Sequence, residues 1–177
     1  EVRVDRISAG VSGWQVRTVS GTIYDARDVV ITAPIEQLRD LLQETALAEP
    51  LLPFESDPTW SVVVESEATL RSQDGIPLDA AFGDGQWLDF ISREGSRPGR
   101  DSAYWVCQAA TPWTQAHLDA HPEEVATTFC HDINVRLGMD AKPVLAHRWR
   151  YARPKDPSLV AQKGAIELAK GLWACGD

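Results

Sequence analysis

The residues of this sequence best suited to binding chemistry form one short run at 147–152, His-Arg-Trp-Arg-Tyr-Ala. Successive side chains of a β-strand point to opposite faces, so we expect His147, Trp149 and Tyr151 to share one face. An aromatic face with an imidazole suits stacking against a flat ligand ring. A structural interpretation stays open beside it, in which the strand packs on a helix and its two arginines lie in solvent.

Other motifs that could support catalysis are weak or absent. His117 and His121 have the i, i+4 spacing of a zinc pair. Pro122 makes His121 a flanking residue, however, so we do not expect the two imidazoles to converge. The sequence has no G-x-S-x-G nucleophile motif and no G-x-G-x-x-G dinucleotide fingerprint. Hydrolase chemistry therefore has no specific support, and no metal site is predicted.

The two ends of the chain predict that it is a piece of a larger protein. The first residues alternate from Glu1 onward without an initiator Met, as if the chain began inside a strand. An apolar run closes the chain on Gly176 and Asp177. After a strand, such a pair typically opens a turn or a helix, where backbone N–H groups and a carboxylate meet a polar ligand. We expect part of the chemistry to lie outside these residues.

The elements that position these residues change character along the chain. Residues 1–24 predict a three-stranded meander punctuated by Gly turns. Residues 28–34 form a continuous β-branched run that ends in Pro, which is typical of a strand buried on both faces. A helix follows from Ile35, with its apolar residues on one stripe. The proline-rich segment 49–58 predicts a connector and a boundary between lobes.

The second half predicts a mostly antiparallel sheet with a long helix. Pro122 at the first helical position, acidic residues in the first turn and Gly138 as a stop predict a helix over 122–137. The fold class that follows is α+β. Strands are predicted over residues 60–68, 78–82, 87–92, 103–110, 143–151 and 172–175.

Composition excludes some classes of partner. The chain has 177 residues, 44% of them hydrophobic, and a formal net charge of −9 without a basic stripe, which argues against a nucleic-acid partner. Its apolar runs are too short to cross a membrane. The three cysteines, Cys107, Cys130 and Cys175, lie in apolar contexts and indicate reduced, buried thiols of a cytoplasmic protein.

Four segments, 28–34, 104–113, 147–152 and 171–177, together resemble the renalase-like, flavin-containing amine oxidoreductases of the FAD/NAD(P)-binding superfamily. The resemblance covers nearly the whole chain, in family order, and implies FAD as the cofactor. It implies that residues 1–35 and 156–177 belong to the FAD-binding domain and residues 36–155 to the substrate-binding domain. The cofactor-binding residues that it implies are Val2, Thr32, Ala33, Pro34, Gly176 and Asp177.

For the parent protein the resemblance implies hydride transfer from an amine or a dihydronicotinamide-type substrate to FAD, with oxygen as the electron acceptor. Trp149 and Tyr151 are the candidate substrate-binding residues, and no catalytic base is assigned. Because the Gly-rich unit is missing, we expect the isolated chain to bind FAD poorly, to be inactive, and to self-associate through exposed apolar surface. The alternative function is a non-enzymatic α+β module that binds a planar ligand or a protein partner.

Overall fold

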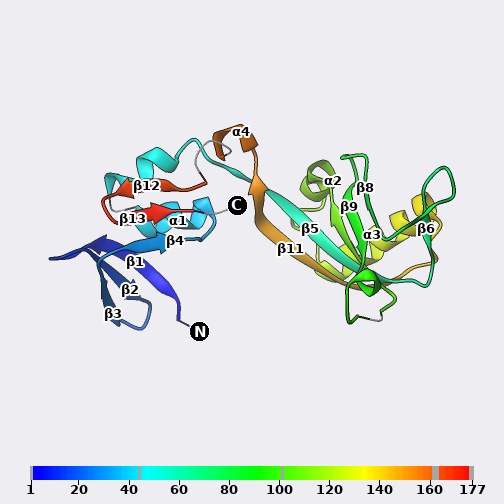
Figure 1. The fold of residues 1–177 in the computed structure, drawn as a ribbon, viewed down its shortest axis with the longest axis horizontal. Coiled ribbons are helices and arrows are strands. Elements are labelled where there is room, and N and C mark those ends of the chain that lie inside the picture. Colours follow the sequence, from blue (N-terminus) through cyan, green and yellow to red (C-terminus); the bar gives the residue numbers. More distant parts are fainter. Residues whose placement is uncertain (1, 44, 101, 161–163, 176–177) are drawn as a thin grey trace. The chain divides into compact units, whose positions relative to one another are not determined.

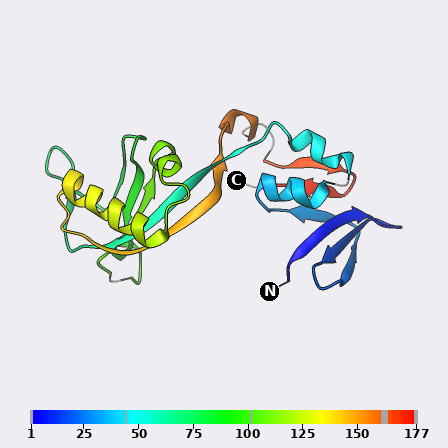
Figure 2. The same cartoon turned by 180° about the vertical axis from the view of Figure 1, so that it is seen from behind.

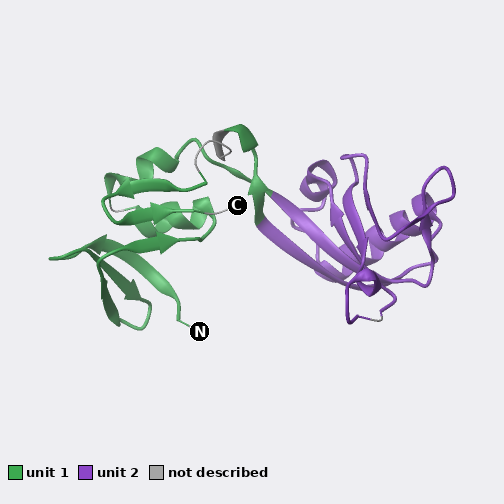
Figure 3. Cartoon of the chain, in the orientation of Figure 1, with its two compact units in different colours: residues 1–57, 151–177 green, residues 58–150 purple. Residues whose placement is uncertain are grey.

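The computed structural model describes residues 2–43, 45–100, 102–160 and 164–175 of the chain. The chain divides into two compact units (Figure 3): unit 1 comprises residues 1–57 and 151–177, and unit 2 comprises residues 58–150. The first division lies within the proline-rich segment 49–58, because the helix that begins at Ile35 packs into the core of unit 1. The second division follows Arg150. The assignment of residues 1–35 and 156–177 to an FAD-binding domain and of residues 36–155 to a substrate-binding domain stays a prediction.

Unit 1 begins with an antiparallel meander in the order β1-β2-β3 (Figure 1). Gly13 makes the entry to the second strand possible, since its φ is +154° and a Cβ there would lie 2.3 Å from the carbonyl oxygen of Ala26. Trp14 is buried at the start of that strand, and its indole N–H donates to the carbonyl of Lys170 at 3.2 Å. The strands are β1 Val4–Ala9, β2 Trp14–Thr18 and β3 Ile23–Ala26.

A second sheet of unit 1 has the order β12-β13-β4, in which β13 runs antiparallel to β12 and parallel to β4. The α1 helix shares a core with this sheet: its residues Leu38 and Leu42 are fully buried and belong to the same cluster as Ile31 and Leu172. The remaining elements of unit 1 are β4 Val29–Ile31, α1 Ile35–Leu42, η1 Ala46–Leu51, α4 Pro157–Val160, β12 Ile166–Ala169 and β13 Leu172–Ala174.

The prediction that residues 28–34 are buried on both faces is wrong for one face. Ile31 is 7% exposed, but Val30 is 62% exposed and its neighbour Trp173 on β13 is 37% exposed. Alternate residues of a strand point to opposite sides, and α1 packs on only one of them. The β-branched run therefore indicated a strand correctly, while its burial depends on packing that these residues do not supply.

Unit 2 is built on a five-stranded sheet in the order β11-β5-β10-β9-β8 (Figure 1). The pairs β5–β10, β10–β9 and β9–β8 are antiparallel. The sheet strands are β5 Ser56–Glu65, β8 Ala80–Phe82, β9 Leu88–Arg93, β10 Tyr104–Ala109 and β11 Lys142–Pro154. The other elements are β6 Leu70–Arg71, β7 Pro77–Leu78, η2 Glu94–Ser96, α2 Thr111–Ala116 and α3 Pro122–Leu137.

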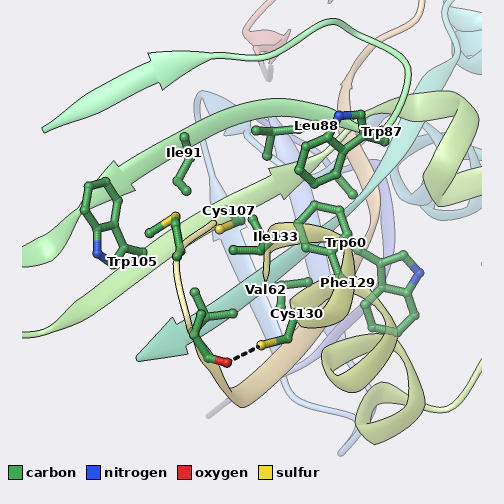
Figure 4. Close-up of a cluster of buried hydrophobic side chains, with 14 of the residues drawn as sticks. Trp60, Val62, Trp87, Leu88, Ile91, Trp105, Cys107, Phe129, Cys130 and Ile133 are labelled. Carbon is green, nitrogen blue, oxygen red and sulfur yellow. Dashed lines mark hydrogen bonds between the residues drawn. The ribbon is translucent and has the colours of Figure 1, made fainter. Parts of the chain in front are cut away.

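The helix α3 covers one side of this sheet (Figures 1 and 2), and the core of unit 2 lies between them. Trp60 and Val62 from β5 and Cys107 from β10 pack there against Phe129 and Ile133 of the helix, all at most 1% exposed (Figure 4). The helix starts at Pro122 and ends at Leu137, as predicted. Gly138 follows it with φ +65°, the left-handed conformation that commonly stops a helix.

All three cysteines are free, and two of them belong to this core. Cys107 is fully buried, and burial raises the pKa of its thiol. Burial also raises the pKa of Cys130, whose thiol donates to the carbonyl of Ala141 (Figure 4). Cys175 is only partly buried, in contrast to the expectation from its apolar context.

The structure confirms the α+β fold class with mostly antiparallel sheets. Elements that the sequence analysis did not predict are the short helices α2, α4, η1 and η2, the strand β12 and the β6–β7 hairpin. Across the described residues, every helix is too short or too polar to cross a membrane.

Candidate functional site

Two segments far apart in the sequence meet at one end of the parallel strand pair β4–β13. Ala174 pairs with Ile31, and the backbone N–H of Cys175 donates to the carbonyl of Ile31 at 2.9 Å. Both strands therefore end at the same edge of the sheet. In sheets with parallel strands, ligands typically bind at this carboxyl end, where loops and helix N-termini present backbone groups.

Residues 32–34 leave this edge directly into α1. Thr32 is exposed, Ala33 and Pro34 are partly buried, and Pro34 caps the helix with its carbonyl accepting from the N–H of Leu38 at 2.9 Å. Glu36 in the first turn is already engaged, since its carboxylate accepts from the N–H of Ser56 at 2.7 Å and from the hydroxyl of Ser56 at 3.1 Å. The edge thus combines a strand end, small side chains and a helix start.

Of the predicted cofactor-binding residues, the structure places Thr32, Ala33 and Pro34 at this edge. Residues 32–34 lie beside Cys175, the last residue that the structure describes. Gly176 and Asp177, which follow Cys175 in the chain, lie outside the described residues. Val2 is 65% exposed and precedes β1, on the other sheet of unit 1. Its predicted role at the adenine stays a prediction.

A second candidate surface lies on the side of the unit 2 sheet opposite α3. Residues that pair directly in an antiparallel sheet share one face. The face that includes Val62, Cys107 and Ile91 is buried against the helix, so the alternate residues form the other face. We call this other side the open face; its members include Ser61, Val63, Phe90, Val106, Gln108 and Trp149.

Trp149 is fixed on the open face by two neighbours. Its indole N–H donates to the hydroxyl of Ser61 on β5 at 3.1 Å. The imidazole of His147 contacts the indole ring edge-on, with the ring centroids 4.6 Å apart and the planes at 68°. Trp149 is nevertheless 52% exposed, so its ring remains available to a ligand.

The structural interpretation of β11 holds for Arg150, which is exposed, but not for Arg148. In that interpretation the arginines lie in solvent and the strand packs on a helix. Instead, Arg148 lies 5.6 Å from the centroid of the buried Trp60 ring, donates to the carbonyl of Leu118, and lies 3.3 Å from Asp119. The helix-facing side of β11 therefore carries the arginine, and the side with His147 and Trp149 is left open.

Tyr151, the other candidate substrate-binding residue, belongs to unit 1, because the division between the units follows Arg150. It is 38% exposed and shares its strand face with Trp149 by the two-residue period. A joint role of these two residues in substrate binding stays a prediction.

The sequence analysis missed Ser61, Gln108 and Phe90, which only the pairing of the strands places on the same face of the sheet as Trp149. The signal that could have found Ser61 is the alternation of residues 60–65, in which Trp60, Val62 and Val64 face the core. Their intervening neighbours must then face the other side.

His117 and His121, the two histidines with the spacing of a zinc pair, lie in different environments in the structure. The ring of His117 stacks on Trp113, with centroids 3.9 Å apart, and its Nδ1 lies 2.9 Å from the Trp113 carbonyl. His121 is the exposed N-cap residue of α3. Among the described residues, no group of three or more His, Cys, Asp or Glu side chains is placed to hold a metal ion.

No protein-family model matches the chain. Solved structures match nearly all of it: a putative protoporphyrinogen oxidase from Exiguobacterium sp. (15% identity, TM-score 0.65, 99% of this chain and 41% of that one) and a putrescine oxidase with redesigned cofactor binding (13%, 0.69, 99% and 42%). A cyclohexylamine oxidase from Brevibacterium oxydans matches similarly (15%, 0.65, 98% and 42%). At these identities the likeness shows a shared fold alone. The chain spans about two fifths of the length of these proteins.

Proposed function

We propose that the chain is part of an FAD-dependent oxidoreductase, with unit 1 contributing to the FAD site and the open face of unit 2 forming a wall of the substrate site. One observation carries the proposal: residues 32–34 and Cys175, about 140 positions apart, lie side by side at the carboxyl ends of the parallel strands β4 and β13. The sequence resemblance assigned residues 32–34 to the cofactor together with Gly176 and Asp177, which follow Cys175 in the chain. The fold shared with solved oxidases supports the proposal.

The residues at this edge fit a dinucleotide cofactor. The side chain of Ala33 is small, which lets backbone and ligand approach each other, and Thr32 offers an exposed hydroxyl. The start of α1 adds a favourable position for an anionic group. Thr32, Ala33 and Pro34 would hold FAD together with Gly176 and Asp177, and Val2 would contribute from the start of the meander. When bound, FAD supplies the hydride acceptor.

The share of this chain in the reaction is binding and orientation. The exposed indole of Trp149 offers a flat surface for a substrate ring, and the hydrogen bond to Ser61 fixes the plane of that surface. The apolar side chains of Val63 and Val106 on the same face exclude water from the substrate. No side chain of the described residues is assigned as the catalytic base.

The finer parts of the proposal concern the parent protein. We include in it a renalase-like subfamily, an amine or a dihydronicotinamide-type substrate, and oxygen as the electron acceptor. The test mixes the parent protein anaerobically with each substrate type and follows the absorbance of oxidised flavin. The substrate type that lowers this absorbance is the one that the protein oxidises. If neither substrate reduces the flavin, the oxidase assignment fails.

The flavin site itself is tested by loading. The reading frame that contains this chain is expressed, and the bound flavin is quantified by absorbance and by fluorescence after heat release. We expect Ala33→Glu to lower the FAD content, because it places a carboxylate where a pyrophosphate would bind. Ala46→Glu, at an exposed position of η1 in the same unit, adds the same charge and should not lower it. A parent without flavin would favour the non-enzymatic binding module instead.

A further inference from the structure

We propose that the open face of unit 2 binds an uncharged, flat substrate group whose hydrogen-bonding edge is recognised by the side-chain amide of Gln108. This inference rests on the proposed function, since it names the substrate class of the surface to which that function assigns the substrate.

Five side chains form a row across the open face. Trp149 bonds to Ser61, Ser61 pairs with Gln108, Gln108 pairs with Phe90, and Phe90 pairs with Phe82. Phe90 and Phe82 contact each other, with centroids 5.2 Å apart. The row thus has an aromatic group at each end, and the small Ser61 and the amide of Gln108 lie between them.

The gap between the aromatic ends matches a small flat molecule. Trp149 and Phe90 are three strand spacings apart, which is about 14 Å at roughly 4.8 Å per spacing. A ligand of one or two rings that rests over Ser61 can therefore make two contacts. Its edge reaches Gln108, and its flat face reaches an aromatic side chain. Trp149 is 52% exposed and Phe82 is 87% exposed, so both offer apolar surface.

Gln108 has the only free amide in this row. It is exposed, and its side chain has no hydrogen-bond partner among the residues that the structure describes. A glutamine amide offers one acceptor and two donors, so it can pair reciprocally with a ligand that carries both, such as a carboxamide. Ser61, in contrast, already accepts the indole N–H of Trp149.

The charge distribution argues against a cationic ligand. Among the described residues that pair across the open face, Glu65 is the only one that is charged at neutral pH. It lies four residues from Ser61 along β5, about 14 Å away at roughly 3.4 Å per residue. Asp89, at the register shift beside Phe90, already has an interaction partner. A diammonium chain would therefore find no pair of free carboxylates in the row, whereas a neutral ring needs none.

The test uses the 177-residue chain, labelled with nitrogen-15, and three probes: benzamide, benzylammonium and 1,4-diaminobutane. Proton–nitrogen spectra are recorded during each titration. We expect benzamide to shift the side-chain amide signals of Gln108 and the indole signal of Trp149, and to bind more tightly than either cation. Tighter binding of a cation, or no shift at these two residues with benzamide, overturns the proposal.

The variant Gln108→Glu keeps the shape of the side chain and replaces the amide with a carboxylate. We expect it to weaken benzamide binding about three- to tenfold, the range for one lost hydrogen bond, and to strengthen benzylammonium binding. Gln115→Glu, at an exposed position of α2, adds the same charge away from the open face and should change neither affinity. Equal effects of the two variants, or none, contradict recognition by Gln108.

Two further outcomes separate this inference from the proposed function. If the parent protein carries flavin but benzamide does not bind the open face, the inference fails and the proposed function stands. If benzamide binds as expected but the parent carries no flavin, the proposed function fails and the surface is a binding site without this chemistry. The signals of Gln108 and Trp149 are also compared at several protein concentrations. If they shift with the protein concentration and benzamide does not suppress these shifts, the occupant of the open face is a second copy of the chain, and the inference is overturned.

Discussion

Replacing Ile133 by alanine tests whether the two units are held by separate cores. Ile133 lies on α3, is fully buried (0% solvent-exposed), and packs in the core of unit 2. The change removes three carbons, worth about 2.4 kcal/mol at roughly 0.8 kcal/mol per buried methylene. The cavity left behind adds to this cost, so we expect a loss of about 3–4 kcal/mol in the free energy of unfolding of unit 2.

The cost should be confined to one unit, because every residue of each hydrophobic core comes from a single unit. Hydrogen exchange followed by mass spectrometry measures this directly. We expect Ile133→Ala to speed the exchange of peptides from α3 and β10 and to leave peptides from α1 unchanged. Leu38→Ala, at the fully buried position of α1, should produce the opposite pattern.

The matched control is Val135→Ala on the same helix, where the side chain is 70% exposed. We expect it to change the unfolding free energy by less than about 0.5 kcal/mol, as is usual for exposed substitutions. Equal loss of protection in both units from Ile133→Ala alone would falsify the separation into two cores. A loss below about 1 kcal/mol would contradict the tight packing around this side chain.

Three further predictions concern backbone, charge and thiol chemistry. Gly171→Ala should destabilise the chain by about 1 kcal/mol more than Gly99→Ala in thermal unfolding, since both have φ +76° but only the Cβ at 171 would lie 2.9 Å from a carbonyl oxygen; equal costs would contradict this. Lys155 lowers the pKa of Glu55, so the stability that this pair contributes is present above the ordinary carboxyl pKa and is lost as the pH falls through the pKa of the folded state. Glu55→Gln should therefore make the unfolding temperature depend less on pH below about pH 5. The same pH dependence in the variant and the original chain would refute the linkage. Cys107 should resist iodoacetamide at pH 8 in the folded chain and react in urea, because burial raises its pKa; rapid modification of the folded chain would disprove its burial.

Features that depend on neighbouring residues alone could be predicted from the sequence. The helix over 122–137 follows from Pro122, the acidic first turn and Gly138, all of which act within one or two turns of the backbone. The meander follows in the same way from alternation and Gly turns. The faces of β11 follow from the two-residue period, which correctly separates His147 and Trp149 from the arginines.

The three-dimensional fold was needed to show which side of each element is covered and which distant residues meet. The β-branched run at Val29–Ile31 has the same local pattern whether Val30 is buried or exposed, because its burial depends on what packs there. The alternation along β11 likewise does not say which side receives α3. The pairing of Gln108 with Ser61 and Phe90 joins three strands, and the meeting of residues 32–34 with Cys175 joins the two ends of unit 1. Such contacts depend on strand order and register, which packing across the whole sheet fixes.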